Sequence, residues 1–349
     1  MKKLGFGIIG LGMIADVHAM AIKDLENGHL VSGCSRSEEG ASRFASKHGC
    51  RSYTDLEEFL ADPELDIVTI ATPSGLHLDS AIAAARAKKH VIVEKPLEIT
   101  KERCNRIIAE CALNDVKLAG IFPSRYHEAP ILIKQAIEQG RFGKIVMADA
   151  QVKWYRSQQY YDSGAWRGTW ELDGGGALIN QSIHAIDLLQ WFMGDVKQVF
   201  AYTDTLAHER IEVEDTAVAV IRFTNGALGV IEGTTGAYPG FLKKIEILGT
   251  EGSVILEEES IIAWNFKHET AEDEIIRERF SHKTKTGGGA ADPKAIGYHG
   301  HYKLFESCAD AVLNDTPVEL SGEQSRNAVE IIEAIYRSSQ SGSFVTLPL

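Results

Sequence analysis

The sequence predicts an α/β fold in two domains. Residues 1–122 are expected to form a parallel sheet with helices, and residues 123–349 an α+β domain with a large, mostly antiparallel, open-faced sheet. Three observations support this prediction. The chain of 349 residues exceeds what one hydrophobic core usually serves. Short apolar runs alternate with helical patterns over about the first 120 residues, as in repeated βα units. Hairpin turn signals follow from about Val199 onward.

In the first domain, β-branched runs such as Ile67–Ile70 are typical of strands covered on both faces, as in a parallel sheet. The predicted strands are Leu4–Ile9, Leu30–Cys34, Ile67–Ala71, Val91–Val93 and Lys117–Ile121. The helices predicted between them are Ile14–Leu25, Glu38–His48, Leu56–Leu60, Leu78–Ala87 and Lys101–Leu113.

In the second domain, the turn sequences Asn225-Gly226 and Gly249–Gly252 separate strand-length runs between about Val199 and Ala263, which predicts hairpins. Alternation over Ile145–Lys153 predicts a further strand. The Gly-rich, polar segment Thr284–Gly300 is expected to be a loop that covers a site. The predicted helices are Ile131–Gln139, an apolar helix over 174–193, Tyr302–Leu313 and Glu323–Ser338.

Composition restricts the function classes. A net charge of −13 argues against nucleic acid as a partner, because phosphate binding needs clustered Lys and Arg. The five cysteines are scattered without a CxxC pair, which indicates reduced thiols and a cytoplasmic location. We expect no signal peptide and no membrane span, because no apolar run approaches about 20 residues. The histidines are scattered, so no metal site is predicted.

A glycine-rich turn lies between the first predicted strand and helix. The segment Gly10-Leu11-Gly12-Met13-Ile14-Ala15 matches G-x-G-x-x-G/A. Gly10 would permit the tight turn, and Gly12 would let the backbone approach a diphosphate held at the helix N-terminus by Met13 and Ile14. The turn predicts a Rossmann dinucleotide-binding domain, and the alternative is an ordinary Gly-rich βα turn.

The end of the second strand bears on the choice of cofactor. An Asp or Glu that binds the ribose of NAD is expected about 20 residues after the glycines, but the chain has Ser35 and Arg36 there. Arg36 could accept the 2′-phosphate of NADP, so the cofactor is NAD(P) with a preference for NADP. The alternative is that Arg36 only stacks on the adenine.

Two further strand ends carry polar residues. Ligands of open α/β sheets bind beyond the carboxyl ends of the strands. Lys95, within Glu94-Lys95-Pro96, is therefore expected to face the cofactor crevice. Cofactor contacts are likewise predicted for Thr72 and Pro73, and for His77, which could equally be a packing residue.

The helix after Gly174-Gly175-Gly176 carries Asn180, His184 and Asp187 at spacings of four and three, which place side chains on one helical face. Because the remaining residues are largely apolar, these polar groups require an explanation. A buried His beside an amide suits proton transfer. The alternative is a core histidine that bonds a backbone carbonyl.

Together, Gly10–Ala15, Glu94-Lys95-Pro96 and Gly174–Asp187 resemble, in this order, the Gfo/Idh/MocA family of NAD(P)-dependent oxidoreductases. The resemblance implies hydride transfer between the nicotinamide and a secondary alcohol or ketone. It also implies that Lys95 is the motif lysine and His184 the catalytic histidine. Many members have Asp where this chain has Asn180, so Asn180 is expected to bind substrate by its amide.

The roles implied for these residues follow ordinary acid–base chemistry. With an unperturbed pKa of about 6.5, His184 can take the hydroxyl proton during oxidation and return it during reduction. Lys95 would hydrogen-bond the same oxygen and stabilise developing alkoxide charge. Asp187 could orient the imidazole or make a structural contact.

Aromatic and guanidinium side chains early in the second domain indicate a carbohydrate-like substrate, a sugar, sugar acid, nucleotide sugar or inositol. Alternatively, the aromatic residues pack the sheet or a subunit interface. Residues after Gly287 resemble the substrate loop of the nucleotide-sugar and hexuronate branch. The predicted substrate contacts are Arg125, Tyr155, Arg156, Trp166, Arg167 and His299.

Two other function classes stay open at this point. One is an NAD-dependent glycosidase that oxidises C3 transiently, and the other is a non-catalytic cofactor-binding regulator. The open sheet, predicted to have about six strands, needs a cover on its second face. A homodimer or homotetramer through this sheet is therefore expected.

Overall fold

The computed structural model describes residues 3–280 and 297–349, and the chain divides into two compact units. The first unit consists of residues 1–123 and 297–329, and the second of residues 124–296 and 330–349. The chain thus returns to the first unit late in the sequence, whereas we expected residues 297–329 in the second domain. The reason is packing, because Phe305 contacts Phe6 with ring centroids 6.1 Å apart.

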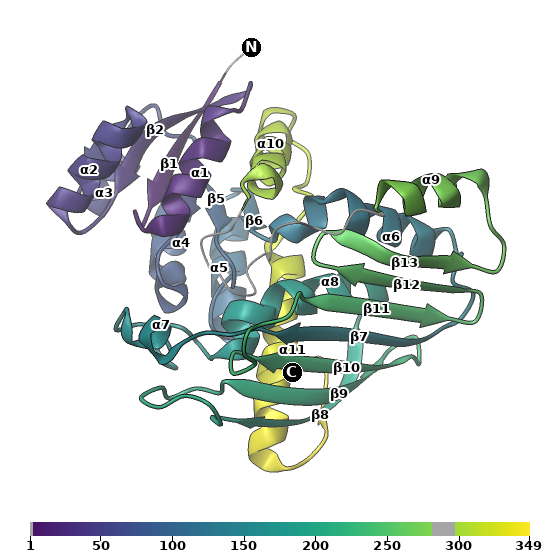
Figure 1. Cartoon of the computed structure of the whole chain (residues 1–349). Helices are drawn as coiled ribbons and strands as arrows, with labels where there is room; N and C mark the ends of the chain where they lie inside the picture. The colour runs from purple at the N-terminus through teal and green to yellow at the C-terminus, as the bar shows by residue number, and fades with distance from the viewer. Residues whose placement is uncertain (1–2, 281–296) are drawn as a thin grey trace. The chain divides into compact units, whose positions relative to one another are not determined.

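The first unit contains a six-stranded sheet in the order β3-β2-β1-β4-β5-β6, in which all strands are parallel (Figure 1). Every residue of the central strand β1 is buried, as the apolar runs predict. The strand β3 was not predicted, because its three residues are not buried and carry no apolar pattern. The strands are β1 (Leu4–Ile9), β2 (Gly28–Cys34), β3 (Arg51–Tyr53), β4 (Ile67–Ile70), β5 (His90–Val93) and β6 (Leu118–Gly120).

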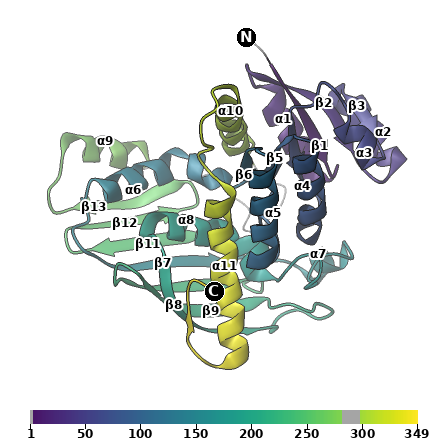
Figure 2. The same ribbon diagram turned by 180° about the vertical axis from the view of Figure 1, so that it is seen from behind.

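Three helices of the first unit begin at side-chain caps that satisfy free backbone N–H groups. Ser37 caps α2, Asp55 caps α3 and Thr100 caps α5. α4 lies beside α5, and α10 packs against α1 (Figure 2). The helices are α1 (Met13–Lys23), α2 (Glu38–His48), α3 (Leu56–Leu60), η1 (Ser74–Leu76), α4 (His77–Arg86), α5 (Lys101–Leu113) and α10 (His299–Leu313).

The second unit contains an eight-stranded sheet in the order β13-β12-β11-β7-β10-β9-β8-β14. β7 and β10 pair in parallel, and the other neighbouring strands are antiparallel. The predicted turn at Asn225-Gly226 connects β9 to β10. The strands are β7 (Ile145–Lys153), β8 (Val196–Asp204), β9 (Thr216–Phe223), β10 (Leu228–Thr234), β11 (Lys244–Gly249), β12 (Gly252–Glu257), β13 (Ser260–Phe266) and β14 (Val345–Thr346).

One face of this sheet is packed and the other is open. Buried and exposed residues alternate along β9. The sheet contacts η3 through β7, β9 and β10, and it contacts α8 through β7 and β11. On the opposite face, Val218 and Val220 are about half exposed. The remaining helices of the chain are η2 (Pro123–Tyr126), α6 (Glu128–Glu138), α7 (Gln158–Asp162), η3 (Ala177–Ser182), α8 (Ile183–Met193), α9 (Ala271–Arg279) and α11 (Gly322–Ser341).

The glycine-rich turn at 174–176 leads into two different windings. Ala177–Ser182 form a π-helical turn, η3, and the regular α-helix α8 begins only at Ile183. The prediction of a single helix starting at the glycines was therefore wrong in its first turns. π-Helical turns are rare and occur frequently at functional sites.

In the described ranges, no helix combines the length and the apolar character that a membrane span requires. All five cysteines are free thiols.

Candidate functional site

The carboxyl ends of four neighbouring strands form a row at one edge of the first sheet. Ile9 at the end of β1 pairs with Cys34 of β2 and Ile70 of β4, and Ile70 pairs with Val93 of β5. The residues that follow these strands therefore lie side by side. This row contains the predicted cofactor contacts of the first unit, namely Gly10, Ser35, Thr72, Glu94 and Lys95.

Gly10 and Gly12 suit a glycine for different structural reasons. Gly10 has φ +89°, and a Cβ there would lie 2.7 Å from the Thr72 amide nitrogen. A Cβ on Gly12 would meet nothing within 4 Å. Gly12 precedes α1, whose N-terminus receives no side-chain cap from the described residues. Open space before an uncapped helix N-terminus fits a bound diphosphate. Met13, half exposed, and Ile14 form the first turn.

The residues after β2 leave one cation exposed. Ser37 accepts the Gly40 N–H through its hydroxyl, and Ser35 accepts the Ser37 N–H, so both hydroxyls have local roles. Arg36 is exposed and forms no hydrogen bond or ion pair with the described parts of the chain. Its guanidinium is therefore available to a ligand at this edge.

The segment after β4 corrects one expectation. His77 is buried, and its Nδ1 and Nε2 lie 2.9 Å and 3.0 Å from the carbonyl oxygens of Pro96 and Thr72. Burial lowers the pKa of His77, so the neutral ring donates to one of these carbonyls at a time. His77 thus joins two strand-end loops and does not present its ring to a cofactor. Pro73 precedes η1. The buried Thr72 hydroxyl forms no hydrogen bond with described residues and suits a ligand contact.

The segment after β5 exposes a single side chain. Between Val91 and Glu98, every residue is buried apart from Lys95, which is partly exposed. The Lys95 backbone N–H donates to the Glu94 carboxylate at 2.9 Å. Burial and backbone bonding therefore fix the segment around the one side chain that can reach solvent or a ligand.

The helical segment in the second unit shows the same pattern. From Asp173 to Gln190, all residues are buried except Asn180 and His184, which are partly exposed. The Asn180 amide donates to Asp173 at 2.9 Å, and this bond fixes its orientation. Two polar side chains are thus accessible in an otherwise buried segment, as a ligand site requires.

The start of this segment is held by Glu214, a residue that the sequence analysis missed. Its buried carboxylate accepts the N–H groups of Gly176 and Leu178 at 2.9 Å and 2.8 Å and the Tyr336 hydroxyl at 3.1 Å. A Cβ on Gly176 would lie 1.7 Å from the Glu214 carbonyl oxygen. The close approach explains the glycine, and the carboxylate fixes the turn that precedes Asn180 and His184.

We expect the Glu214→Gln substitution to change how stability depends on pH. Burial raises the pKa of Glu214 to about 7, against the opposing effect of its hydrogen bonds. Between about pH 4.5 and 7 the unfolded chain loses this proton while the folded chain keeps it, so this group's contribution to stability falls as pH rises. The Glu214→Gln variant has no carboxyl group at this position. Its melting temperature relative to that of the wild type should therefore increase as the pH rises from 5 to 8. A constant difference across that range would contradict the assignment.

Arg125 and Asp187 form a buried ion pair in the second unit. The Arg125 Nε and Nη2 donate to the two Asp187 oxygens at 2.8 Å and 2.7 Å. Asp187 therefore anchors α8 and does not orient the imidazole of His184 through that carboxylate. Arg125 is 8% exposed, so its predicted contact with substrate is not the arrangement found here. A double hydrogen bond of this kind is specific in geometry and holds both partners in place.

The guanidinium groups of Arg156 and Arg167 both lie next to the ring of Tyr160, a residue of α7. The guanidinium carbons of Arg167 and Arg156 lie 4.3 Å and 5.5 Å from the centre of the Tyr160 ring. The Tyr160 hydroxyl accepts from Arg167 at 2.7 Å and from Gln181 at 3.3 Å. The Arg167 guanidinium carbon also lies 4.4 Å from the centre of the Trp166 ring. The positive charge of the partly exposed Arg167 and the polarised rings suit a negatively charged ring-shaped ligand. Tyr160 is a further candidate that the sequence analysis did not select.

The remaining predicted substrate contacts differ in exposure and in the unit to which they belong. Arg156 is 5% exposed, so it supports Tyr160 more than it presents a free guanidinium. Tyr155 packs edge-on against Tyr238. His299, exposed at the start of α10, belongs to the first unit, as does Lys95, whereas His184 belongs to the second. Most of the predicted covering loop, residues 284–296, lies outside the described residues.

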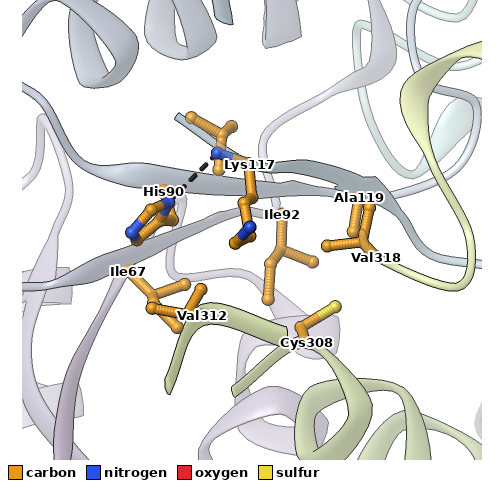
Figure 3. Close-up of a pocket in the computed structure, with 9 residues that line it drawn as sticks. Ile67, His90, Ile92, Lys117, Ala119, Cys308, Val312 and Val318 are labelled. Carbon is orange, nitrogen blue, oxygen red and sulfur yellow. Dashed lines mark hydrogen bonds between the residues drawn. The ribbon is translucent and has the colours of Figure 1, made fainter. Parts of the chain in front are cut away.

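A small cavity in the first unit is unrelated to these residues. It measures about 10 Å³ and is lined mainly by apolar side chains of β4, β5 and α10, with His90 and Lys117 (Figure 3). The volume suffices for about one water molecule. Burial raises the pKa of Cys308 in its wall to about 12, so this thiol is not a nucleophile at neutral pH.

Comparison with known proteins places both units in one family. Residues 4–121 match "Oxidoreductase family, NAD-binding Rossmann fold", and residues 131–255 match "GFO/IDH/MocA C-terminal domain". The chain belongs to the Gfo/Idh/MocA family. This confirms the resemblance and the two-part fold predicted from the sequence.

Individual relatives support the same conclusion over most of the chain. The myo-inositol 2-dehydrogenase of Thermotoga maritima is 32% identical over 72% of this chain and 74% of its own length. The levoglucosan dehydrogenase of Pseudarthrobacter phenanthrenivorans is 27% identical over 100% of this chain and 99% of its own. The WlbA dehydrogenase of Bordetella pertussis, solved with NADH and UDP-GlcNAcA, is 36% identical over 100% of both chains, with a TM-score of 0.89.

This family member is therefore an oxidoreductase with an NAD-binding Rossmann fold that acts on CH–OH groups. The open space at Gly12, the uncapped N-terminus of α1 and the buried Thr72 hydroxyl fit the dinucleotide.

Proposed function

We propose that this protein transfers a hydride between NAD(P) and a secondary hydroxyl of a sugar acid, with nucleotide-linked hexuronates as the leading substrates. One observation carries the proposal: each unit has a buried segment in which only polar side chains are partly exposed. These are Lys95 in the first unit, and Asn180 and His184 in the second. The two units correspond to cofactor binding and substrate binding.

His184 is the acid–base group in this proposal, and Lys95 is the hydrogen-bond donor to the same substrate oxygen. When bound, the nicotinamide supplies or accepts the hydride. His184 removes the hydroxyl proton during oxidation, and Lys95 stabilises the negative charge that develops on oxygen. Asn180, oriented by Asp173, positions the substrate through its amide. These three roles suit the chemistry of the three side chains, and none of them requires a carboxylate next to the reacting oxygen.

The substrate class rests on the arginine–tyrosine cluster and on the relatives. Arg167, next to the rings of Tyr160 and Trp166, favours a ligand with a carboxylate or phosphate over a neutral inositol. The WlbA structure with UDP-GlcNAcA, 36% identical over its whole length, supports the same class.

A turnover panel tests this proposal. Purified protein is incubated with NAD or NADP and, separately, UDP-GlcNAcA, free hexuronates, aldoses, levoglucosan and myo-inositol, and formation of reduced nicotinamide is followed by absorbance. We expect the largest kcat/KM with a uronate. A higher kcat/KM with myo-inositol or a neutral aldose than with every uronate would overturn the substrate class.

We expect Arg36 to give the protein affinity for NADP. Its exposed guanidinium lies beyond β2, where a carboxylate that repels the 2′-phosphate is absent from the sequence. NADPH should bind more tightly than NADH in fluorescence titrations. Arg36→Ala should weaken NADPH binding about tenfold while leaving NADH almost unchanged, because one charge-assisted contact is lost. Tenfold tighter binding of NADH than NADPH by the wild type would contradict this expectation.

We expect two or four copies of the chain to associate through the open face of the second sheet. Its exposed apolar residues form a contiguous group on neighbouring strands, because Val218 and Val220 of β9 pair with Tyr202 and Phe200 of β8. Val220→Lys should shift the species measured by light scattering at micromolar concentration to the monomer. Leu113→Lys, on an exposed position of α5, is the control and should have no effect. A monomeric wild type would contradict the association.

A further inference from the structure

Three buried side chains from distant parts of the sequence meet in the first unit. His18 of α1, Glu94 after β5 and His301 of α10 are 0%, 7% and 3% exposed. The His18 Nε2 lies 2.9 Å from Glu94 Oε1, and the His301 Nε2 lies 3.4 Å from the same oxygen. The sequence analysis regarded the histidines as scattered. The return of α10 to the first unit brings them together.

The contacts define where the protons lie. Glu94 receives two imidazole N–H groups at Oε1 and the Lys95 backbone N–H at Oε2. Burial alone would raise the pKa of Glu94, but the histidine hydrogen bonds hold it well below its usual range. Burial lowers the pKa of His18, which opposes a second proton on its ring. The Thr69 hydroxyl, 3.2 Å away, then donates to His18 Nδ1. Glu94 is therefore a buried carboxylate that hydrogen bonds hold in place.

We propose that Glu94, held by His18 and His301, is the positioning residue for Lys95. The carboxylate connects the backbone of Lys95 to the dinucleotide helix α1 and to α10, so the Lys95 side chain starts from a fixed point. Its charge also favours the protonated form of the neighbouring lysine. This inference rests on the proposed function in one respect, because the proposed function is what makes the position of Lys95 important for catalysis.

Two imidazoles and a carboxylate are also a set of metal ligands. In a tetrahedral zinc site with bonds of about 2.0 to 2.1 Å, neighbouring ligand atoms lie about 3.3 Å apart. The 2.9 Å between His18 and Glu94 is shorter and is an ordinary hydrogen-bond distance. The geometry therefore favours the hydrogen-bonded arrangement, and metal analysis is one outcome of the test.

The test measures the reactivity of Lys95 itself and needs no substrate. Full-length protein is labelled with trace acetic anhydride across a pH series, and mass spectrometry gives the labelling rate of Lys95 relative to the exposed Lys23. In Glu94→Gln, loss of the negative charge next to Lys95 should raise the relative labelling rate of Lys95 at neutral pH about threefold. His301→Leu should change the rate at least about twofold, because one donor that fixes the carboxylate is lost. His301→Gln restores an N–H near the Nε2 position and should return the rate toward wild type.

Phe305→Leu is the matched control. Phe305 packs edge-on against His18 at 5.2 Å, so this variant disturbs the packing of the cluster and leaves its hydrogen-bonding groups intact. It should leave the relative rate of Lys95 unchanged. Unchanged rates in both Glu94→Gln and His301→Leu, or an equal change in Phe305→Leu, would overturn the proposal. One metal ion per chain, lost in His301→Leu, would also overturn it. If Lys95→Ala keeps full turnover, the proposed function fails, but these labelling outcomes are unaffected.

Discussion

His184→Ala should lower kcat for sugar oxidation at least about 100-fold, the scale of a lost acid–base group. In free energy this corresponds to about 2.7 kcal/mol of transition-state stabilisation. The proton of the substrate hydroxyl would then have to leave without a positioned base. Only His184 and Asn180 open from the buried segment between Asp173 and Gln190, and the Asn180 amide cannot act as a base. Steady-state kinetics with the best uronate substrate measures the effect.

Two controls separate chemistry from folding. His268→Ala removes an exposed histidine of the same unit and should keep wild-type turnover. NADH affinity should be unchanged in His184→Ala, because His184 belongs to the second unit and the phosphate turn to the first. The pH profile of kcat/KM should also lose its acidic limb in this variant. Turnover close to wild type in His184→Ala would eliminate His184 as the base.

Lys95→Ala should cause a loss of similar size, at least about 100-fold in kcat, because a charged donor to the developing alkoxide is removed. Lys95 is the only residue between Val91 and Glu98 that is not buried, so neighbouring side chains in this segment cannot replace it. Lys95→Arg keeps the charge but changes the donor geometry, and should recover only part of the activity.

Lys23→Ala serves as the control, since Lys23 is exposed at the end of α1. It should leave both kcat and NADH affinity unchanged. If Lys95→Ala reduces affinity for NADH but leaves kcat unchanged at saturating cofactor, Lys95 is a cofactor contact and not part of the chemistry. That result would remove it from the proposed catalytic pair.

Much of the first unit could be predicted because its signals are local. The glycine turn follows a buried strand, and parallel strands place their carboxyl ends in one row. The predicted bounds of β1, α2, α3, α5 and β7 are those of the structure. Spacing alone also selected Asn180 and His184, which are the two openings in the buried segment.

What the sequence analysis missed depends on contacts between distant residues. Glu214 contacts the turn at Gly176 from 38 positions away, and His301 meets Glu94 from 207 away. The return of residues 297–329 to the first unit likewise depends on packing. The sequence left the role of Asp187 open between orienting the imidazole and a structural contact, because its buried partner, Arg125, lies 62 residues earlier. Glu214 lies just before β9, and His301 lies in the first turn of α10. Neither position has a local sequence pattern from which its contacts could be predicted.

The most direct test of the account follows two products in one reaction. The protein is incubated with UDP-GlcNAcA and excess NAD(P), and reduced nicotinamide is measured by absorbance while the sugar is analysed by mass spectrometry. The account predicts one reduced nicotinamide for each sugar that loses two hydrogens. Cleavage of the glycosidic bond with no net reduced nicotinamide and a cofactor that never exchanges would contradict it, because that is the behaviour of an NAD-dependent glycosidase.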